Sequence, residues 1–187
     1  APLRGKKGTC YEGGMRVPFV AGWAKAGKAN PFKIARNHLH HEQIGTVMDI
    51  YSTIVDASNS SSPAKHPVDG VSLLPQLSGK SNQERPDHFM CHFPHSHRSS
   101  YFTSFRKGDW KLIYRYLTTA GKRKNKQPIP KCELYNLKKD PYETKNLALG
   151  NSKKTNEMIR LMTKQLESEN ALFPVRDDLE LRPQRIQ

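Results

Sequence analysis

A glycine-rich segment near the start of the chain, residues 2–18, contains the side chains best suited to chemistry. It reads PLRGKKGTCYEGGMRVP, so its four glycines are interspersed with lysines and arginines. Glycine lets the backbone approach a ligand closely, and a lysine ammonium supplies a compact point charge to an anion. These residue types suit the binding of an oxyanion, although composition by itself favours a solvated basic loop.

No other familiar catalytic or metal-binding pattern occurs in the sequence. Residues 5–9 lack the spacing of a phosphate-binding P-loop, and there is no GxSxG or HExxH pattern. The three cysteines, at positions 10, 91 and 132, form no CxxC pair and no zinc framework. Histidines cluster at 38–41 and 88–97, where we expect surface or hydrogen-bonded rings. We therefore expect no metal site in this chain.

The charge of the chain favours anionic partners. Lysine and arginine number 31 against 17 acidic residues, which gives a net charge of +14 and a pI near 9.8. Nucleic acid, an acidic membrane surface and a phosphated or sulfated ligand all fit this charge. No run approaches the 18 apolar residues of a transmembrane helix, and we expect no membrane partner.

The elements that must position these residues change in character near residue 86. Before it, the short apolar run 18–24 predicts a buried strand, and apolar residues between 44 and 55 recur with the spacing of an amphipathic helix. After it, β-prone runs and one helical stripe predict a small antiparallel sheet covered by a helix. The strands are expected at 88–93, 101–105, 110–116 and 132–137, the helix at 152–169, and an extended tail at 175–187.

Five segments, in order, resemble motifs of the type I, arylsulfatase-like sulfatases. Residues 2–18 resemble the pattern PLRGGKGTxYEGGxRVP. The four later segments resemble VxD[LI]xPT[IL], DGxSLLPLL, RxGDWKLI and ELYDLxxDPxETxNLA, and they lie at residues 46–56, 69–77, 106–113 and 133–148. Ser52 stands where the second pattern has proline. The chain therefore resembles the C-terminal part of such a sulfatase.

The resemblance implies an α/β fold with two parts. Residues 1–85 are expected to be the C-terminal portion of the large domain of an alkaline-phosphatase-like sulfatase fold. Residues 86–187 are expected to form a small α+β subdomain, an antiparallel sheet plus a C-terminal helix, with an extended tail. The strand and helix of residues 18–57 would belong to a larger sheet, so their apolar faces should be exposed without it.

The resemblance also implies the chemistry of the full-length parent, which hydrolyses sulfate esters with a formylglycine nucleophile and a bound calcium. Formylglycine arises in a C/S-x-P-x-R motif, and none is intact here, since residues 61–65 have lysine in place of arginine. The acidic calcium ligands are also missing and are expected before Ala1. We expect both groups in the parent only, no calcium bound by this fragment, and no activity of the fragment alone.

Lys7 is the catalytic residue that the resemblance carries over to this chain. The family's lysine before Gly-Thr contacts the sulfate oxygens, and Lys7 precedes Gly8 and Thr9. Lys6 stands where the pattern often has glycine and is a lesser candidate. Glu12 and the glycines after it are expected to be structural, holding the loop in place.

His92 and His95 open the small subdomain. In related sulfatases a comparable His-aromatic-Pro-His stretch reaches the rim of the pocket, which implies that both histidines bind substrate. The alternative, a rim loop without substrate contact, stays equally open.

Two other classes of function remain to be weighed. A basic nucleic-acid-binding module would explain the charge, but no helix-turn-helix, RNP motif or zinc finger is present, and we expect no nucleic-acid partner. A sulfated-polysaccharide-binding module without catalysis is the other alternative. The expected partners are a sulfated small molecule or polysaccharide, the missing N-terminal part of the same enzyme, and a second fragment through self-association. The resemblance implies a periplasmic or secreted protein.

Overall fold

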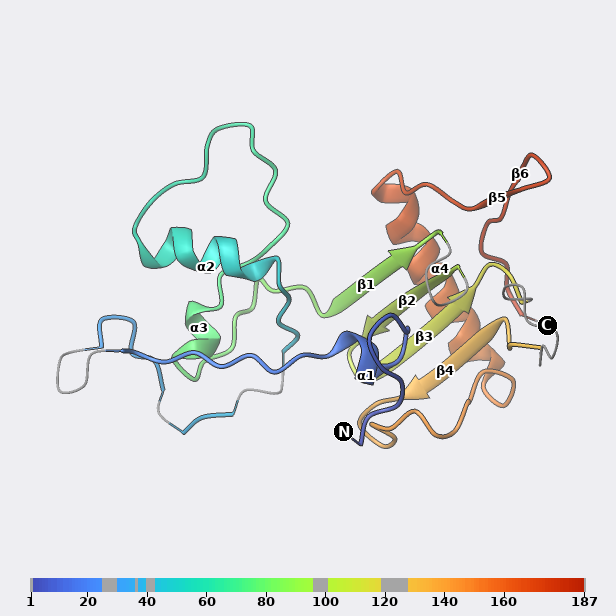
Figure 1. The fold of residues 1–187 in the computed structure, drawn as a ribbon, viewed down its shortest axis with the longest axis horizontal. Coiled ribbons are helices and arrows are strands. Elements are labelled where there is room, and N and C mark those ends of the chain that lie inside the picture. Colours follow the sequence, from blue (N-terminus) through green and yellow to red (C-terminus); the bar gives the residue numbers. More distant parts are fainter. Residues whose placement is uncertain are drawn as a thin grey trace. The chain divides into compact units, whose positions relative to one another are not determined.

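The computed structural model describes residues 2–24, 30–35, 37–39, 43–95, 101–118 and 128–186. The chain forms two compact units, one of Ala1–Val17 with His88–Gln187 and one of Pro18–Asp87 (Figure 1). Within the described residues, no helix has the length and apolar character needed to span a membrane.

The first unit is a four-stranded antiparallel sheet packed against a long helix, as the sequence predicts. The strands follow one another in chain order and are β1 (His88–Phe93), β2 (Phe102–Lys107), β3 (Trp110–Arg115) and β4 (Cys132–Asn136). The hairpin of β2 and β3 pairs Lys107 with Trp110, and Gly108 takes the positive φ of +54° that its tight turn requires. The helix is α4 (Ser152–Ser168).

The two faces of this sheet carry different partners, because side chains alternate along each strand. Leu112 and Tyr114 of β3 pack in the core with the predicted stripe of α4, in which Met158 and Met162 are fully buried. Ile113, between them, belongs to a second cluster that includes Cys10. Helix α4 therefore covers one face, and residues near the start of the chain cover the other (Figure 1).

The expected division into residues 1–85 and 86–187 describes domains of a longer protein and stays a prediction. Within this chain, residues 2–17 form one unit with the sheet. The reason is that Cys10 shares its buried cluster with Phe102, Ile113 and Tyr135, one from each of strands β2, β3 and β4.

The second unit, Pro18–Asp87, is built around a buried ion pair. Asp49, at the start of α2 (Asp49–Ala57), lies 2.9 Å from Arg85 and accepts backbone hydrogen bonds from Thr46 and Val71. A short helix, α3 (Leu74–Leu77), follows. Helix α2 begins later than the apolar spacing from residue 44 predicts, after Gly45 and Thr46, which are weak helix formers.

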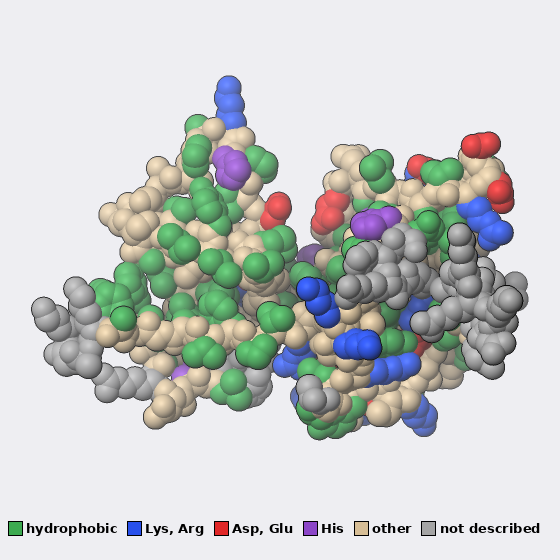
Figure 2. Space-filling view, in the orientation of Figure 1, with side chains coloured by type: hydrophobic (Ala, Val, Ile, Leu, Met, Phe, Trp, Pro, Cys, Tyr) green, Lys and Arg blue, Asp and Glu red, His purple; other side chains and the backbone are tan. Residues whose placement is uncertain are grey.

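The prediction of a buried strand at residues 18–24 is wrong. Those residues form no strand, and the side chains of Phe19 and Val20 are 56% and 92% exposed. A strand needs a neighbour to pair with, and the described part of this unit contains no sheet. The apolar residues of α2 are exposed as well, among them Ile50 and Ile54, and Figure 2 shows hydrophobic side chains spread over this unit.

The C-terminal tail also differs from its expectation in one detail. Within the extended segment, β5 (Val175–Arg176) and β6 (Leu179–Glu180) form a short antiparallel pair. Asp177 and Asp178, both with positive φ, make the turn between them.

Candidate active-site loop

Lys6 and Lys7 lie at the tip of a tight turn. The glycines on either side, Gly5 and Gly8, have φ values of +82° and +85°, a region that side chains with a Cβ rarely enter. The Thr9 hydroxyl closes the turn, because its Oγ1 donates to the Lys6 carbonyl at 2.8 Å and accepts from the Lys6 N–H at 3.2 Å. Both lysine side chains are exposed. The turn thus presents two ammonium groups from a defined backbone.

The chain then folds back beneath this turn as a short helix, α1 (Glu12–Met15). Gly13 donates its N–H to the Arg4 carbonyl at 2.8 Å, and a Cβ at Gly13 would lie 2.6 Å from the same oxygen. A Cβ at Gly14 would lie 2.4 Å from the carbonyl oxygen of Thr9. Only glycine fits at either position, which supports the structural role expected for this pair. We call residues 4–16 the Lys7 loop.

A buried triad of charges joins the Lys7 loop to strand β3. The Lys111 ammonium lies 2.8 Å from Glu12 Oε1 and 2.9 Å from Glu143 Oε1, and the three side chains are 1%, 6% and 0% exposed. The Glu12 N–H also donates to Glu143 Oε2 at 2.7 Å. Burial raises the pKa of the Glu143 carboxyl, and the Lys111 charge opposes that rise. We call these residues the Lys111 triad.

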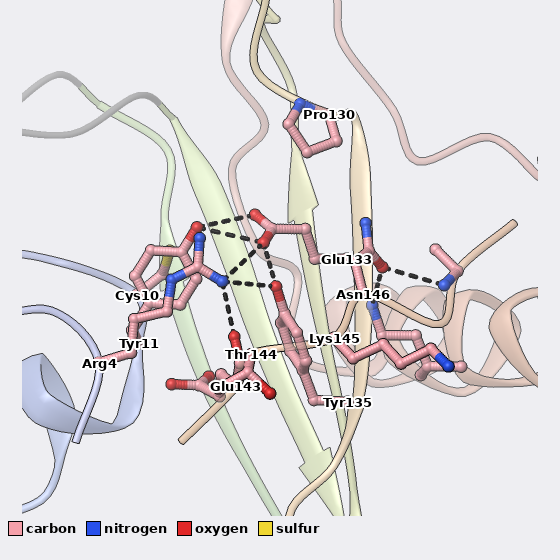
Figure 3. A network of polar contacts seen from close by, with 12 residues as sticks. Arg4, Cys10, Tyr11, Pro130, Glu133, Tyr135, Glu143, Thr144, Lys145 and Asn146 are labelled. Carbon is pink, nitrogen blue, oxygen red and sulfur yellow. Dashed lines mark hydrogen bonds and ion pairs between the residues drawn. The ribbon is translucent and has the colours of Figure 1, made fainter. Parts of the chain in front are cut away.

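A second polar cluster surrounds Glu133 of β4 (Figure 3). Its buried carboxylate forms an ion pair with Arg115 and accepts hydrogen bonds from the hydroxyls of Tyr135 and Tyr11, the latter at 3.0 Å. Burial acts to raise the pKa of Glu133, but the Arg115 charge and these hydrogen bonds outweigh it and hold that pKa below its usual value. Burial beside Glu133 raises the pKa of Tyr11 to about 12.

Arg4 links this cluster to the start of the Lys7 loop. Its Nη1 donates to the Tyr135 hydroxyl at 2.9 Å and to the Glu143 carbonyl at 2.7 Å, and its guanidinium lies 3.9 Å from the centre of the Tyr11 ring. We call Arg4, Tyr11, Arg115, Glu133 and Tyr135 the Glu133 cluster. The loop is thus attached to the sheet at both of its ends.

The two predicted histidines lie in the same unit as Lys7. His92, on β1, has both ring nitrogens within 2.7 Å of partners, Nδ1 of the Thr103 hydroxyl and Nε2 of the Leu172 carbonyl. Contact with a ligand would require His92 to release one of them. His95 follows β1 and is exposed, with its ring centre 3.9 Å from that of Phe93. The substrate role of both residues stays a prediction.

No cluster of His, Cys, Asp or Glu that could hold a metal ion occurs in the described part of the chain. A cavity of about 340 Å³ lies between the end of α4 and the tail, with Leu166, Phe173 and Arg182 in its lining. Lys7 is not among its lining residues. Lys7 therefore presents its charge on an exposed turn.

The residues that hold the loop were missed at the sequence level. Lys111 and Glu143 fall inside the segments that resemble sulfatase motifs, but no role was assigned to either. One signal was available: Lys111 and Arg115 alternate with the core residues of β3, which places both on the opposite face of the sheet.

Comparison with known proteins places these observations in a family context. Residues 6–171 match the family described as N-sulphoglucosamine sulphohydrolase, C-terminal. The dog N-acetylgalactosamine-6-sulfatase is 34% identical over 80 residues, which are 43% of this chain and 14% of that protein. A Formosa agariphila sulfatase is 29% identical over 179 residues, and human arylsulfatase A is 29% identical over 178. These matches cover 90% and 88% of this chain but only 29% and 32% of the relatives.

Solved structures agree in fold. A structure from work on the metabolism of multiple glycosaminoglycans by Bacteroides thetaiotaomicron has a TM-score of 0.61 at 20% identity, and covers 89% of this chain and 32% of that one. Ps i-CgsB has a TM-score of 0.56 at 22% identity, with coverage of 88% and 32%. The chain thus spans about a third or less of the length of these relatives.

Proposed function

This chain belongs to the N-sulphoglucosamine sulphohydrolase C-terminal family, and we propose that it serves a longer protein that hydrolyses sulfate esters. As predicted, the chain is the C-terminal part of a sulfatase with an alkaline-phosphatase-like fold. The proposal goes further by assigning an activity to the longer protein and a role in it to one loop. The observation that carries it is the exposed Lys7 ammonium on a turn whose backbone is fixed at both ends.

Lys7 is the proposed sulfate ligand. As the S–O bond of a sulfate ester breaks, negative charge grows on the leaving oxygen, and a fixed ammonium near that oxygen stabilises the transition state more than the bound substrate. The loop supplies such a group without a large rearrangement, because Gly5 and Gly8 already hold the turn. His95, exposed beside β1, is proposed as a substrate contact, and His92 as a second one.

The calcium and the formylglycine that the family resemblance implies are proposed to be held outside this chain. The described residues contain no cluster able to bind a metal ion, so the donor set here does not fit calcium. No step of the reaction is assigned to either group in this chain. The part assigned to this chain is to bind and orient the sulfate through Lys7.

The proposed substrate is a sulfated small molecule or polysaccharide. The relatives include N-acetylgalactosamine-6-sulfatases, and Ps i-CgsB has also been solved in complex with k-i-k-neocarrahexaose. A net charge of +14 suits such an anionic substrate. Figure 2 shows Lys and Arg side chains gathered on the unit that carries the Lys7 loop. We also propose that the longer protein is periplasmic or secreted.

The proposed partner in the assembled enzyme is the N-terminal part of the same protein. It would cover the exposed apolar side chains of the Pro18–Asp87 unit, such as Phe19, Val20 and Ile54. When this part is absent, the same surface is proposed to cause self-association of the chain.

Substitution of the two neighbouring lysines tests the proposal. In the longer protein, Lys7→Ala should lower kcat/KM by about 10²- to 10³-fold, the usual loss for one donor to transition-state charge. Lys7→Arg should restore little, because a planar guanidinium does not replace a point charge. Lys6→Ala is the matched control, since both side chains are exposed on one turn, and it should have a much smaller effect. Equal activity of Lys7→Ala and wild type would overturn the proposal.

A further inference from the structure

We propose that Glu143, acting with Lys111, is a positioning residue that sets the Lys7 loop for sulfate binding. This inference rests on the proposed function, because it takes Lys7 as the group that meets the sulfate. Neither residue is near the loop in sequence: the Glu12–Lys111 hydrogen bond spans 99 positions and the Glu12–Glu143 hydrogen bond spans 131.

Glu143 holds both ends of the Lys7 loop at once. Its backbone carbonyl accepts from Arg4 at 2.7 Å, on the side of the loop that precedes the lysines. Its carboxylate Oε2 accepts from the Glu12 N–H at 2.7 Å, on the side that follows them. Its Oε1 lies 2.9 Å from Lys111, which is fixed in strand β3. One residue therefore relates the two ends of the loop to each other and to the sheet.

The backbone of Glu143 is strained in order to make these contacts. Its φ of +55° lies in the left-handed region, which glycine enters freely and other residues enter at a cost. The Asp140 carboxylate maintains this turn by accepting the N–H groups of Thr144 and Lys145, at 2.8 and 2.9 Å. A glycine would satisfy the backbone more easily, so the glutamate side chain supplies what the position requires. Strain of this kind is typical of functional sites.

The charges of the triad also indicate a positioning role. Two carboxylates share one ammonium in a site that is almost fully buried, so acidic groups outnumber the basic group there. Arg16 lies 3.8 Å from Glu12, but its side chain is 57% exposed. Apolar residues of similar volume commonly stabilise a core at least as well as buried ions do, whereas ions with fixed partners define a geometry.

The expected consequence for catalysis follows from the precision that the reaction needs. A displacement of about 1 Å in a catalytic group can lower a rate about 100-fold. Loss of the Glu143 carboxylate should leave Lys7 exposed and charged but less well placed. The effect should therefore appear in kcat, through Lys7, and not in the folding of the sheet.

Hydrogen exchange on this chain tests the positioning itself. In Glu143→Ala, the amide hydrogen of Glu12 should exchange at least about tenfold faster, since its hydrogen bond to a charged acceptor is lost. Amides of β3 should keep their wild-type rates, which shows that the sheet is folded. Glu157→Ala is the control, because Glu157 forms a 2.9 Å ion pair with Lys154 and its side chain is exposed on α4. Unchanged exchange at Glu12 would overturn the inference.

Glu143→Gln provides a second variant should the alanine variant unfold. It keeps the size of the side chain and leaves Lys111 and Glu12 as a balanced pair, so the core should tolerate it. The amide has a single acceptor oxygen, so it cannot accept from both the Lys111 ammonium and the Glu12 N–H, and its other end is an NH2 group, which donates. Faster exchange at Glu12 is again the expected result, and wild-type exchange in a folded Glu143→Gln protein would contradict the inference.

A double-mutant cycle in the longer protein tests the link to catalysis. Glu143→Ala should lower kcat about 10- to 100-fold with little change in KM, and should have little further effect when Lys7 is already alanine. An equal fall in both backgrounds, or an unaltered kcat in Glu143→Ala alone, would overturn this inference. An unaltered kcat in Lys7→Ala would overturn the proposed function and this inference with it.

Discussion

Removal of the Glu133 carboxylate should destabilise the sheet unit more than the loss of any exposed ion pair. In Glu133→Ala, Arg115 loses its partner while its side chain is only 5% exposed. The hydroxyls of Tyr11 and Tyr135 lose their acceptor at the same time. The variant therefore leaves the buried Arg115 charge without a carboxylate partner, with hydrogen bonds to the Pro130 carbonyl and the Tyr11 hydroxyl among its remaining contacts.

The expected cost is about 3–5 kcal/mol, the usual penalty for breaking a buried ion pair by removing one partner. A typical domain is stable by only about 5–15 kcal/mol, so the unit should still fold but with a much reduced margin. The matched control is Glu180→Ala, since Glu180 pairs with Arg182 at 2.7 Å and both side chains are about half exposed. An exposed pair contributes about 0–1 kcal/mol.

Hydrogen exchange of the buried strand amides in β3 and β4 measures this difference. Exchange of such amides requires the unit to open, so its rate follows the free energy of unfolding. Glu133→Ala should accelerate it by about 10²-fold or more, because each 1.4 kcal/mol corresponds to a factor of ten. Glu180→Ala should leave it within about fivefold of wild type. If both variants exchange alike, the Glu133 cluster does not stabilise the unit as we argue.

The difference in stability between wild type and Glu133→Ala should depend on pH. The pKa of Glu133 is lower in the folded protein than its ordinary value of 4.5, so the unfolded chain binds the proton more tightly. The stabilisation is fully present above pH 4.5 and is lost as the pH falls through the folded pKa. The difference between wild type and Glu133→Ala should therefore shrink in acid.

Two further predictions concern single side chains. His92→Ala should lower the stability of the sheet unit by about 0.5–1.5 kcal/mol in chemical denaturation, because it removes the hydrogen bond to the buried Thr103 hydroxyl and the ring contacts with Tyr116 and Phe173. His95→Ala should leave stability unchanged and raise KM for a sulfated substrate; an unaltered KM in His95→Ala would contradict its proposed role. Gly14→Ala should lower the melting temperature, since its Cβ would lie 2.4 Å from the Thr9 carbonyl oxygen, whereas Gly150→Ala, with open space around it, should not. Equal melting temperatures for the two glycine variants would refute the close approach.

Local patterns were enough to predict the sheet unit. In β3, Leu112 and Tyr114 alternate with residues of the other face, and in α4 Met158 and Met162 recur one turn apart. Each pattern depends only on neighbours in sequence, so it can be recognised without knowledge of the rest of the fold. The predicted strands, hairpin and helix were accordingly confirmed.

The polar contacts that hold the Lys7 loop could not be predicted in the same way. Glu12, Lys111 and Glu143 come from three distant segments, and no periodicity connects them. The resemblance marked all three segments but not the contacts between them. The role of Lys7 itself stays a prediction, which its exposed position on a fixed turn supports.

The strand predicted at 18–24 failed for a different reason. Its apolar run is real, but an apolar run forms a strand only where another strand can pair with it. The described part of the Pro18–Asp87 unit offers none, and Val20 is 92% exposed. The apolar run therefore indicates that the segment would need a neighbouring strand, or another apolar surface, in a larger fold.

Sulfate release is the measurement that tests the central claim most directly. The longer protein, carrying formylglycine and calcium, and the present 187-residue chain should be assayed side by side on an aryl sulfate and on sulfated sugars. We expect the longer protein to release sulfate and the chain alone to release none, because Lys7 can assist the reaction but cannot replace a nucleophile. Sulfate release by the chain alone, or none by the loaded longer protein on any of these substrates, would contradict the account.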